Sequence, residues 1–204
     1  MIHWGTTMQT PSISIKNLTL NIHAAPKATI PGLAMLGAAI AAGGVTTAEA
    51  PTNTPEVGQV WPGEGGINGG LVPARGDVPE HYLIIASKDI GDHAWGGRGS
   101  ESEATSKTDG RHNTLKLIKG EHPAAKSAYE FSADGHDDFY LPAAAELYHC
   151  WVNCSEVFAQ DCYYWSSSQR SASYAFTMLF DDGYQYSCGK GYELRVRPVR
   201  RLFI

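Results

Sequence analysis

The spacing of hydrophobic residues changes several times along the chain, and each change predicts a different element. Apolar and polar residues alternate between Pro11 and Ala24, which predicts a strand or hairpin apart from the main domain. Residues 43–58 are rich in Gly, Thr and Pro and predict a linker. Two further strands are expected over residues 66–72 and 81–87, around a turn that contains Pro, Gly and Asp.

The middle of the chain has the three- and four-residue spacing of helices. Residues 101–120 begin polar and end with apolar residues before Gly120, which predicts a helix that stops at a glycine cap. Residues 122–131 are expected to form a second helical piece. Between Asp134 and Phe158, apolar residues recur at helical steps after Pro142, so we expect an amphipathic helix of about four turns there.

The chain after Tyr163 has the pattern of short strands. The segments are YYWSSS, AFTMLFDDGYQYSC and YELRVRPVRRLFI, and Asp181-Asp182-Gly183 predicts a hairpin turn between two such runs. Helices followed by a compact antiparallel sheet predict an α+β domain over residues 59–204. An N-terminal strand and linker segment over residues 1–58 would precede it.

Composition excludes one broad class of function. The 204 residues include 16 Lys and Arg against 21 Asp and Glu, a formal net charge of −5, so the chain is not a generally basic nucleic-acid binder. The local exception is a group of arginines near the C-terminus, at Arg195, Arg197, Arg200 and Arg201. We interpret them as partners of the ten acidic residues between Glu130 and Glu193 rather than as a nucleic-acid patch.

Residues 30–44 are apolar and rich in small side chains, and Ala48-Glu49-Ala50 imitates a signal-peptide cleavage site. The run lacks a basic region at the N-terminus, so we expect no cleaved signal peptide. It is too short and too rich in glycine for a membrane span, which needs about 20 apolar residues. We therefore interpret it as a small-residue helix or an extended packing segment.

No constellation of side chains indicates catalysis or metal binding. The cysteines at positions 150, 154, 162 and 188 match no structural zinc spacing, so we expect free thiols, with a Cys162–Cys188 disulfide as the alternative. The acidic group around His136 (Asp134, Asp137 and Asp138) fits helix-terminal charge and turn hydrogen bonding. Ser166, Ser167 and Ser168 lack the glycine elbow of a nucleophilic serine. The lone histidines at 81, 93, 112 and 122 fit ordinary surface or core positions.

Aromatic residues are concentrated near the C-terminus. Of the 21 aromatic residues, 16 lie between Tyr129 and Tyr192, and six of the ten tyrosines lie between Tyr163 and Tyr192. Tyrosine with serine and glycine is the composition of antibody binding surfaces, because tyrosine supplies large rigid contact area. Burying all six hydroxyls would require six partners, so we expect several of these tyrosines to be exposed in a binding surface.

Several segments together resemble a known family. DGHDDFYLPAAAEL, YYWSSS, AFTMLFDDGYQ and ELRVRPVRR, in this order, resemble the C-type-lectin-fold domain of the Lcl C-terminal family. They are most similar to its phage- and prophage-encoded members and to the variable proteins of diversity-generating retroelements. VWPGEGGINGGLV and HYLIIAS resemble the opening strands of those phage members, so the resemblance covers roughly residues 60–201. It implies a C-type lectin fold, with two helices flanking a small antiparallel sheet whose terminal strands pair.

In the retroelement proteins, adenine-directed mutagenesis diversifies codons for residues that line an exposed ligand-binding face. Carried over by position, the resemblance implies that this face consists of Cys162, Tyr163, Arg170, Ser171, Ser173, Tyr174, Phe176, Met178, Tyr184, Tyr186, Ser187, Cys188, Gly191 and Tyr192. The fixed frame would be Trp165, Ser166, Ser167, Phe180, Asp182, Gly183, Arg195 and Arg197. Diversified asparagine codons can become Tyr, Ser, Cys, Gly, Phe or Arg, but they cannot yield Met178.

The resemblance implies a non-enzymatic protein that binds a protein or a surface glycan of a target cell. It would act on a virion or a host cell surface, with the N-terminal segment used for attachment or self-association. The tripeptides Glu-Pro-Asn and Gln-Pro-Asp, which hold calcium in sugar-binding lectins, do not occur, so no metal or other cofactor is expected. The alternatives are a fixed phage tail or structural assembly module of the same fold, and an oxidase resembling formylglycine-generating enzymes that uses Cys162 and Cys188.

Overall fold

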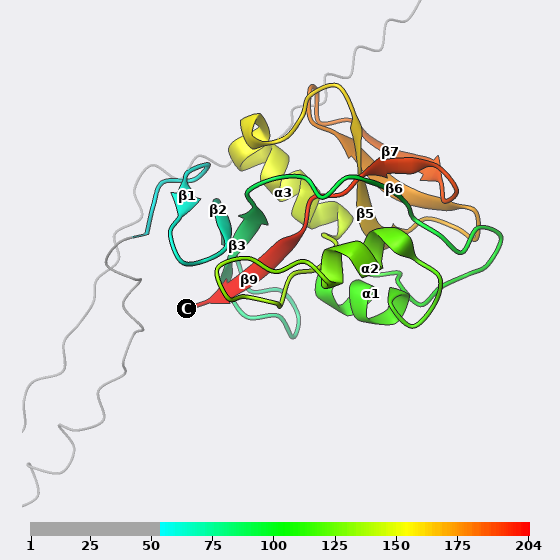
Figure 1. Ribbon diagram of the computed structural model, residues 1–204, viewed down its shortest axis with the longest axis horizontal. Coiled ribbons are helices and arrows are strands. Elements are labelled where there is room, and N and C mark those ends of the chain that lie inside the picture. The colour runs from blue at the N-terminus through cyan, green and yellow to red at the C-terminus, as the bar shows by residue number, and fades with distance from the viewer. Residues whose placement is uncertain (1–53) are drawn as a thin grey trace, which may run out of the picture. The chain divides into compact units, whose positions relative to one another are not determined.

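The computed structural model describes residues 54–204, and its secondary structure is mixed α+β (Figure 1). The strand or hairpin predicted over residues 11–24 and the small-residue segment at residues 30–44 lie outside the described residues. The elements are β1 (Val60–Trp61), β2 (Gly66–Val72), β3 (His81–Ala86), β4 (Asp92–Ala94), α1 (Gly110–Leu117), α2 (Pro123–Tyr129), α3 (Ala144–Cys154), a 3₁₀ turn (Ser155–Val157), β5 (Tyr163–Gln169), β6 (Tyr174–Leu179), β7 (Gln185–Gly189), β8 (Glu193–Arg195) and β9 (Val199–Phe203).

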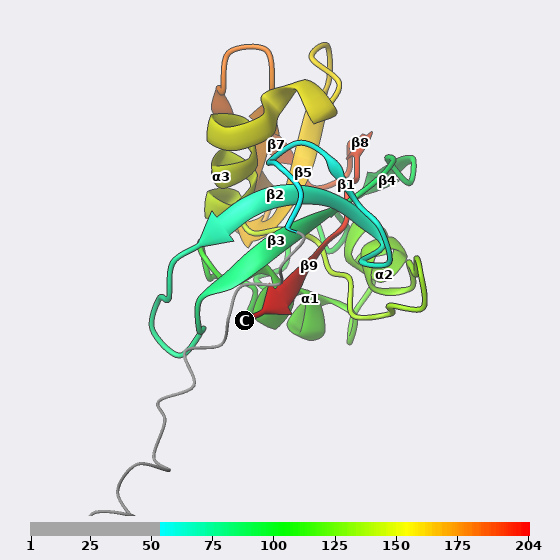
Figure 2. The ribbon, with the colours of Figure 1, turned by 90° about the vertical axis from the view of Figure 1, so that its left-hand side faces the viewer.

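These strands form two sheets, with α3 between them (Figures 1 and 2). The first sheet has the order β1-β2-β3-β9, and the second has the order β4-β8-β5-β6-β7. β9 pairs antiparallel with β3, so the C-terminal strand returns beside a strand from the beginning of the domain. The helices and strands that lie between β3 and β9 in the sequence are therefore inserted between two strands that pair with each other.

Most predicted elements are confirmed, with changes at their ends. The strand expected over residues 66–72 is β2, and the one expected over 81–87 is β3, which ends one residue earlier. The first helix ends at Leu117, but Gly120 lies beyond its cap residue Ile118 and has no positive φ, so it is not a left-handed glycine cap. The helix predicted after Pro142 is shorter than four turns, because α3 ends at Cys154 and continues as a 3₁₀ turn.

The last predicted strand is divided between the two sheets. Residues 193–195 form β8 in the second sheet, and residues 199–203 form β9 in the first. The interruption includes Pro198, which has no N–H for a ladder. Because the chain passes from one sheet to the other here, Arg195 lies in the second sheet, and Arg200 and Arg201 lie in the first.

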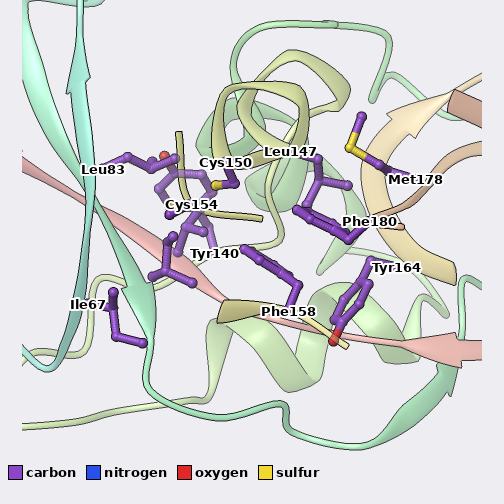
Figure 3. Packing of buried hydrophobic residues seen from close by; sticks show 12 residues of the cluster. Ile67, Leu83, Tyr140, Leu147, Cys150, Cys154, Phe158, Tyr164, Met178 and Phe180 are labelled. Atoms are coloured by element: carbon purple, nitrogen blue, oxygen red, sulfur yellow. The ribbon is translucent and has the colours of Figure 1, made fainter. Parts of the chain in front are cut away.

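The interior consists of two hydrophobic clusters. The first surrounds α3 and joins both sheets through residues such as Leu83, Leu147 and Phe180 (Figure 3). The second contains Trp95, Trp165 and the alanines of α2. Tyr148, one of the aromatic residues of α3, is 46% exposed and lies outside both clusters.

Candidate ligand-binding surface

The register of the second sheet assigns the predicted site residues to its two faces. Residues directly opposite each other in an antiparallel pair share a face, and neighbours along a strand alternate between faces. Tyr164 is opposite Met178 and Tyr163 is opposite Leu179, so Tyr163 and Met178 lie on different faces. Thr177 is opposite Tyr186, which places Tyr186 on the face of Tyr163. Alternate residues of β6 such as Phe176 and Met178 therefore lie on one face, and Tyr184 and Tyr186 lie on the other.

One face carries a cluster that we call the tyrosine surface, formed by Tyr163, Tyr184 and Tyr186. The rings of Tyr184 and Tyr186 stack with centroids 5.7 Å apart, and the Tyr163 ring lies 6.2 Å from that of Tyr186. The side chains of Tyr184 and Tyr186 are 52% and 50% exposed. Within residues 54–204, none of these three hydroxyls has a hydrogen-bond partner. Burial, together with nearby groups such as Cys188 and Tyr184, raises the pKa of Tyr163.

The opposite face carries a second group, the Phe176 patch, formed by Arg170, Tyr174 and Phe176. The Lys107 Nζ lies 4.5 Å from the centroid of the Phe176 ring, and the Arg170 guanidinium lies 5.8 Å from it. These distances are those of cation–π contacts. Tyr174 is 49% exposed beside them. The predicted face is therefore divided into two surfaces on opposite sides of one sheet.

The fourteen predicted ligand-binding residues differ widely in exposure. Exposed are Arg170, Tyr174, Tyr184, Tyr186, Gly191 and Tyr192; partly buried are Cys162, Tyr163, Ser171, Ser173, Phe176, Ser187 and Cys188. Met178 is 1% exposed and belongs to the first hydrophobic cluster, so it presents nothing to a ligand. Its position opposite Tyr164, on the face covered by α3, explains this burial.

The residues expected to form a fixed frame have internal contacts. The Trp165 indole donates to the His93 carbonyl at 2.8 Å, and Ser166 Oγ donates to the Phe176 carbonyl at 2.8 Å. At the hairpin turn, Asp182 Oδ1 accepts the Tyr184 N–H at 2.9 Å. Gly183 has a φ of 73°, and a Cβ there would lie only 2.4 Å from the Trp151 ring. The turn that presents the tyrosines is thereby held against α3.

The frame serines and Phe180 are fully buried. Ser167 Oγ accepts from the Asn113 amide at 3.3 Å, and Ser168 Oγ donates to the Ser106 carbonyl at 2.7 Å. Phe180 stacks on Phe158 with ring centroids 3.8 Å apart. Ser167 and Ser168 thus bind side-chain and backbone groups beside the second sheet.

The C-terminal arginines are paired with carboxylates, although mostly not with those expected. Arg195 and Arg197 share Asp89, at 3.0 Å and 2.9 Å. Asp92, Glu64 and Asp109 supply further partners, and only Asp138 and Glu146 come from the predicted interval between Glu130 and Glu193. Most of the carboxylate partners come from earlier in the chain because β8 and β9 pair with strands from the beginning of the domain.

The four cysteines differ in what their side chains contact. All four are free thiols, so the alternative Cys162–Cys188 disulfide is not formed. Cys162 packs against the first hydrophobic cluster and Cys188 against the second. Burial raises the pKa of Cys162, and it raises that of Cys154 to about 12, which disfavours the reactive thiolates.

The acidic group before α3 is used internally. Asp138 binds Arg200 at 2.6 Å, and Asp134 accepts the Gly65 N–H at 3.1 Å. Among residues 54–204, no three His, Cys, Asp or Glu side chains are grouped so that they could hold a metal ion. In the same range, no helix is long and apolar enough to cross a membrane.

A pocket of about 360 Å³ lies away from both surfaces, between α3 and the β2–β3 loop. Val72, Val78 and Val152 contribute apolar walls, and His81 and His149 contribute ring nitrogens. His149 precedes Cys150 on α3, and the sequence suggested it only as a neighbour of the Cys150–Cys154 pair, whose spacing matches no structural zinc site. None of the predicted ligand-binding residues lines this pocket.

Comparison with known proteins does not add to this description. No family model matches the chain, and no curated protein matches it.

Proposed function

We propose that the chain is a non-enzymatic ligand-binding protein that presents an exchangeable surface on a C-type lectin fold. The surface is the tyrosine surface, formed by Tyr163, Tyr184 and Tyr186. This proposal follows the sequence resemblance to the variable proteins of diversity-generating retroelements. The fold assignment is supported by the pairing of β3 with β9 around the inserted helices and second sheet.

The observation that carries the proposal is the contrast between buried and exposed tyrosines. Tyr164 is buried, and its hydroxyl donates to Asp89 at 2.9 Å and accepts the Ala159 N–H. Tyr184 and Tyr186 are half exposed and have no internal hydroxyl partner within the described range. Exposed tyrosines on a rigid backbone lose little conformational entropy on binding, which suits them to recognise a ligand.

The positions of Cys162 and Cys188 give little support to the alternative of an oxidase. An oxidase that used Cys162 and Cys188 would need its two sulfur atoms close together, whereas they pack against different clusters. The proposed partner is a protein or a surface glycan on a target cell, and the proposed location is a virion or a host cell surface.

The diversification part of the proposal is tested in the neighbouring DNA. A near-copy of the segment encoding residues 163–200, differing from it at adenines and accompanied by a reverse-transcriptase gene, is the expected finding. Without such a copy, the fixed tail or assembly module of the same fold becomes the better account.

The binding part is tested with labelled protein and a panel of intact bacterial cells. We expect the Tyr184→Ala/Tyr186→Ala variant to lose at least about tenfold in affinity, because exposed tyrosines are frequent binding hot spots. Its Tm should remain unchanged. Tyr129→Ala and Tyr148→Ala are matched controls, since these side chains are 45% and 46% exposed on helices. Protease and periodate treatment of the cells then separates protein ligands from glycans, and equal binding by all variants would refute the proposal.

A further inference from the structure

The edges of the two sheets differ in how they are protected against pairing. Exposed edge strands attract other strands unless they are short, charged, bulged or interrupted by proline. Within the described residues, β1 has two residues, β4 has three with Asp92 among them, and β9 carries Arg200 and Arg201. β7 has five residues, Gln185–Gly189, with no charge, no proline and an unbroken register against β6.

The outward backbone groups of β7 can be identified from its hydrogen bonds. The Leu179 N–H donates to the Tyr184 carbonyl, and the Lys190 N–H donates to the Ser173 carbonyl. Even-numbered residues of this strand therefore bond toward β6, and odd-numbered residues point their backbone groups outward. Within residues 54–204, the N–H and carbonyl groups of Gln185 and Ser187 have no partner. The Gly189 carbonyl accepts from Tyr192 at 3.0 Å, which closes the turn at the end of the strand.

We propose that β7 pairs antiparallel with β7 of a second copy of this chain, centred on Ser187. This register places each Ser187 opposite its own copy and each Gln185 opposite Gly189. It gives the outward N–H and carbonyl of each Ser187 a partner in the other copy, and no like charges meet along the strand.

Charges at the two ends of the hairpin favour a second copy over another strand. The turn at one end carries the exposed Asp181 and Asp182. At the other end lie the exposed Arg98 and Arg170, with Arg98 Cδ 3.8 Å from the position of a Cβ on Gly191. Within the described residues neither arginine has a carboxylate partner. An antiparallel pair brings the acidic turn of each copy to the basic end of the other.

The pairing also changes the binding surface. A two-fold axis perpendicular to the sheet keeps the same face of both copies on the same side. The tyrosine surfaces of the two copies would then join into one continuous site across the paired edge. This consequence rests on the proposed function, whereas the pairing itself does not.

The test is the oligomeric state of the full chain, measured by analytical ultracentrifugation over a wide range of protein concentration. We expect a monomer–dimer equilibrium that Ser187→Pro shifts to monomer. Proline is tolerated at this position because the outward N–H takes no part in the β6–β7 ladder. Ser187→Lys should have the same effect through an edge charge. Ser127→Lys on α2 is the matched control, since Ser127 is also partly buried but lies on a helix and not on β7.

A charge exchange tests the register. Asp181→Arg and Arg98→Asp should each weaken the dimer, and the double variant should restore it, because the two side chains interact across the pair. A chain that is monomeric at every concentration overturns the proposal, as does a dimer that survives Ser187→Pro and Ser187→Lys. These measurements use no ligand, so a dimer whose tyrosine variants still bind cells normally would contradict the proposed function alone.

Discussion

The C-terminal arginines and the β6–β7 hairpin use polar side chains in opposite ways. Arg197, Arg200 and Arg201 are almost fully buried, and every one of them binds at least one carboxylate. Tyr184 and Tyr186 are half exposed and have no hydroxyl partner within residues 54–204. The two regions are adjacent in sequence, but only the first holds distant segments of the chain together.

The difference in burial indicates which residues can be substituted without unfolding the domain. A buried arginine that loses its carboxylate leaves an uncompensated charge, which is among the most costly of substitutions. Replacing an exposed tyrosine leaves no buried group without a partner, so the free energy of unfolding should change little. A surface that must vary is therefore best placed on the hairpin and not on the arginine strands.

The largest effect is expected at Glu146, which is 4% exposed. Its carboxylate accepts the Ala143 N–H at 2.7 Å, the Tyr140 hydroxyl at 2.9 Å and Arg201 at 3.0 Å. Glu146→Ala should lower the free energy of unfolding by about 3–5 kcal/mol, because it removes one of the two carboxylates that bind the buried Arg201. It also leaves the buried Tyr140 hydroxyl and the Ala143 N–H without their acceptor. Urea denaturation measures this. Glu103→Ala is the control, since Glu103 forms an exposed ion pair with Lys116 and should change little.

A smaller effect is expected within the hairpin itself, where Met178 and Tyr186 lie on neighbouring strands. Met178→Ala should cost about 2–4 kcal/mol, because it opens a cavity in the first hydrophobic cluster. Tyr186→Ala should stay within about 0.5 kcal/mol of the parent. Thermal and urea denaturation measure both variants. Equal decreases in the free energy of unfolding would contradict the assignment of Met178 to the core and of Tyr186 to the surface.

The sequence predicted the elements of this fold better than their pairing. β2, β3, α2 and the β6–β7 turn follow from alternation, helical spacing and an Asp-Gly turn, which are local signals. The division of the last strand between two sheets is not local. It depends on pairing with β3 and β4, about a hundred residues earlier in the chain, and Asp89 and Asp92, which bind Arg195 and Arg197, lie in this same part of the chain.

The candidate site shows the same limit. Alternation along a strand puts Tyr174 with Phe176 on one face, and Tyr184 with Tyr186 on one face, as the structure has them. Only the register of β6 against its neighbours reveals that these faces are opposite and that α3 covers Met178. A pattern with a period of two cannot say which of its two faces is solvated, because both contain aromatic residues.

The smallest expected effect is a loss of stability at acidic pH, which should reach the buried part of the domain but not the β6–β7 hairpin. Burial lowers the pKa of His81, His122 and His149, so the folded protein keeps these rings neutral where the unfolded chain begins to bind protons. Stability is therefore complete above about pH 6.5, the ordinary histidine pKa, and falls as pH drops below it. We expect a drop of about 1 kcal/mol between about pH 7.5 and 5.5, measured by urea denaturation.

Two variants assign that drop to buried histidine. His81 is 2% exposed, and its Nδ1–H donates to the Pro79 carbonyl at 2.8 Å, so His81→Asn keeps a donor there without a titrating ring. This variant should show a shallower loss of stability on acidification, whereas His112→Asn, at an exposed position of α1, should keep the parental slope. No titrating histidine lies on the β6–β7 hairpin, so the tyrosine surface should keep its affinity for cells over the same pH range while the domain beneath it weakens. Parallel losses of affinity and stability would instead mean that the hairpin is as dependent on the buried network as the arginine strands are.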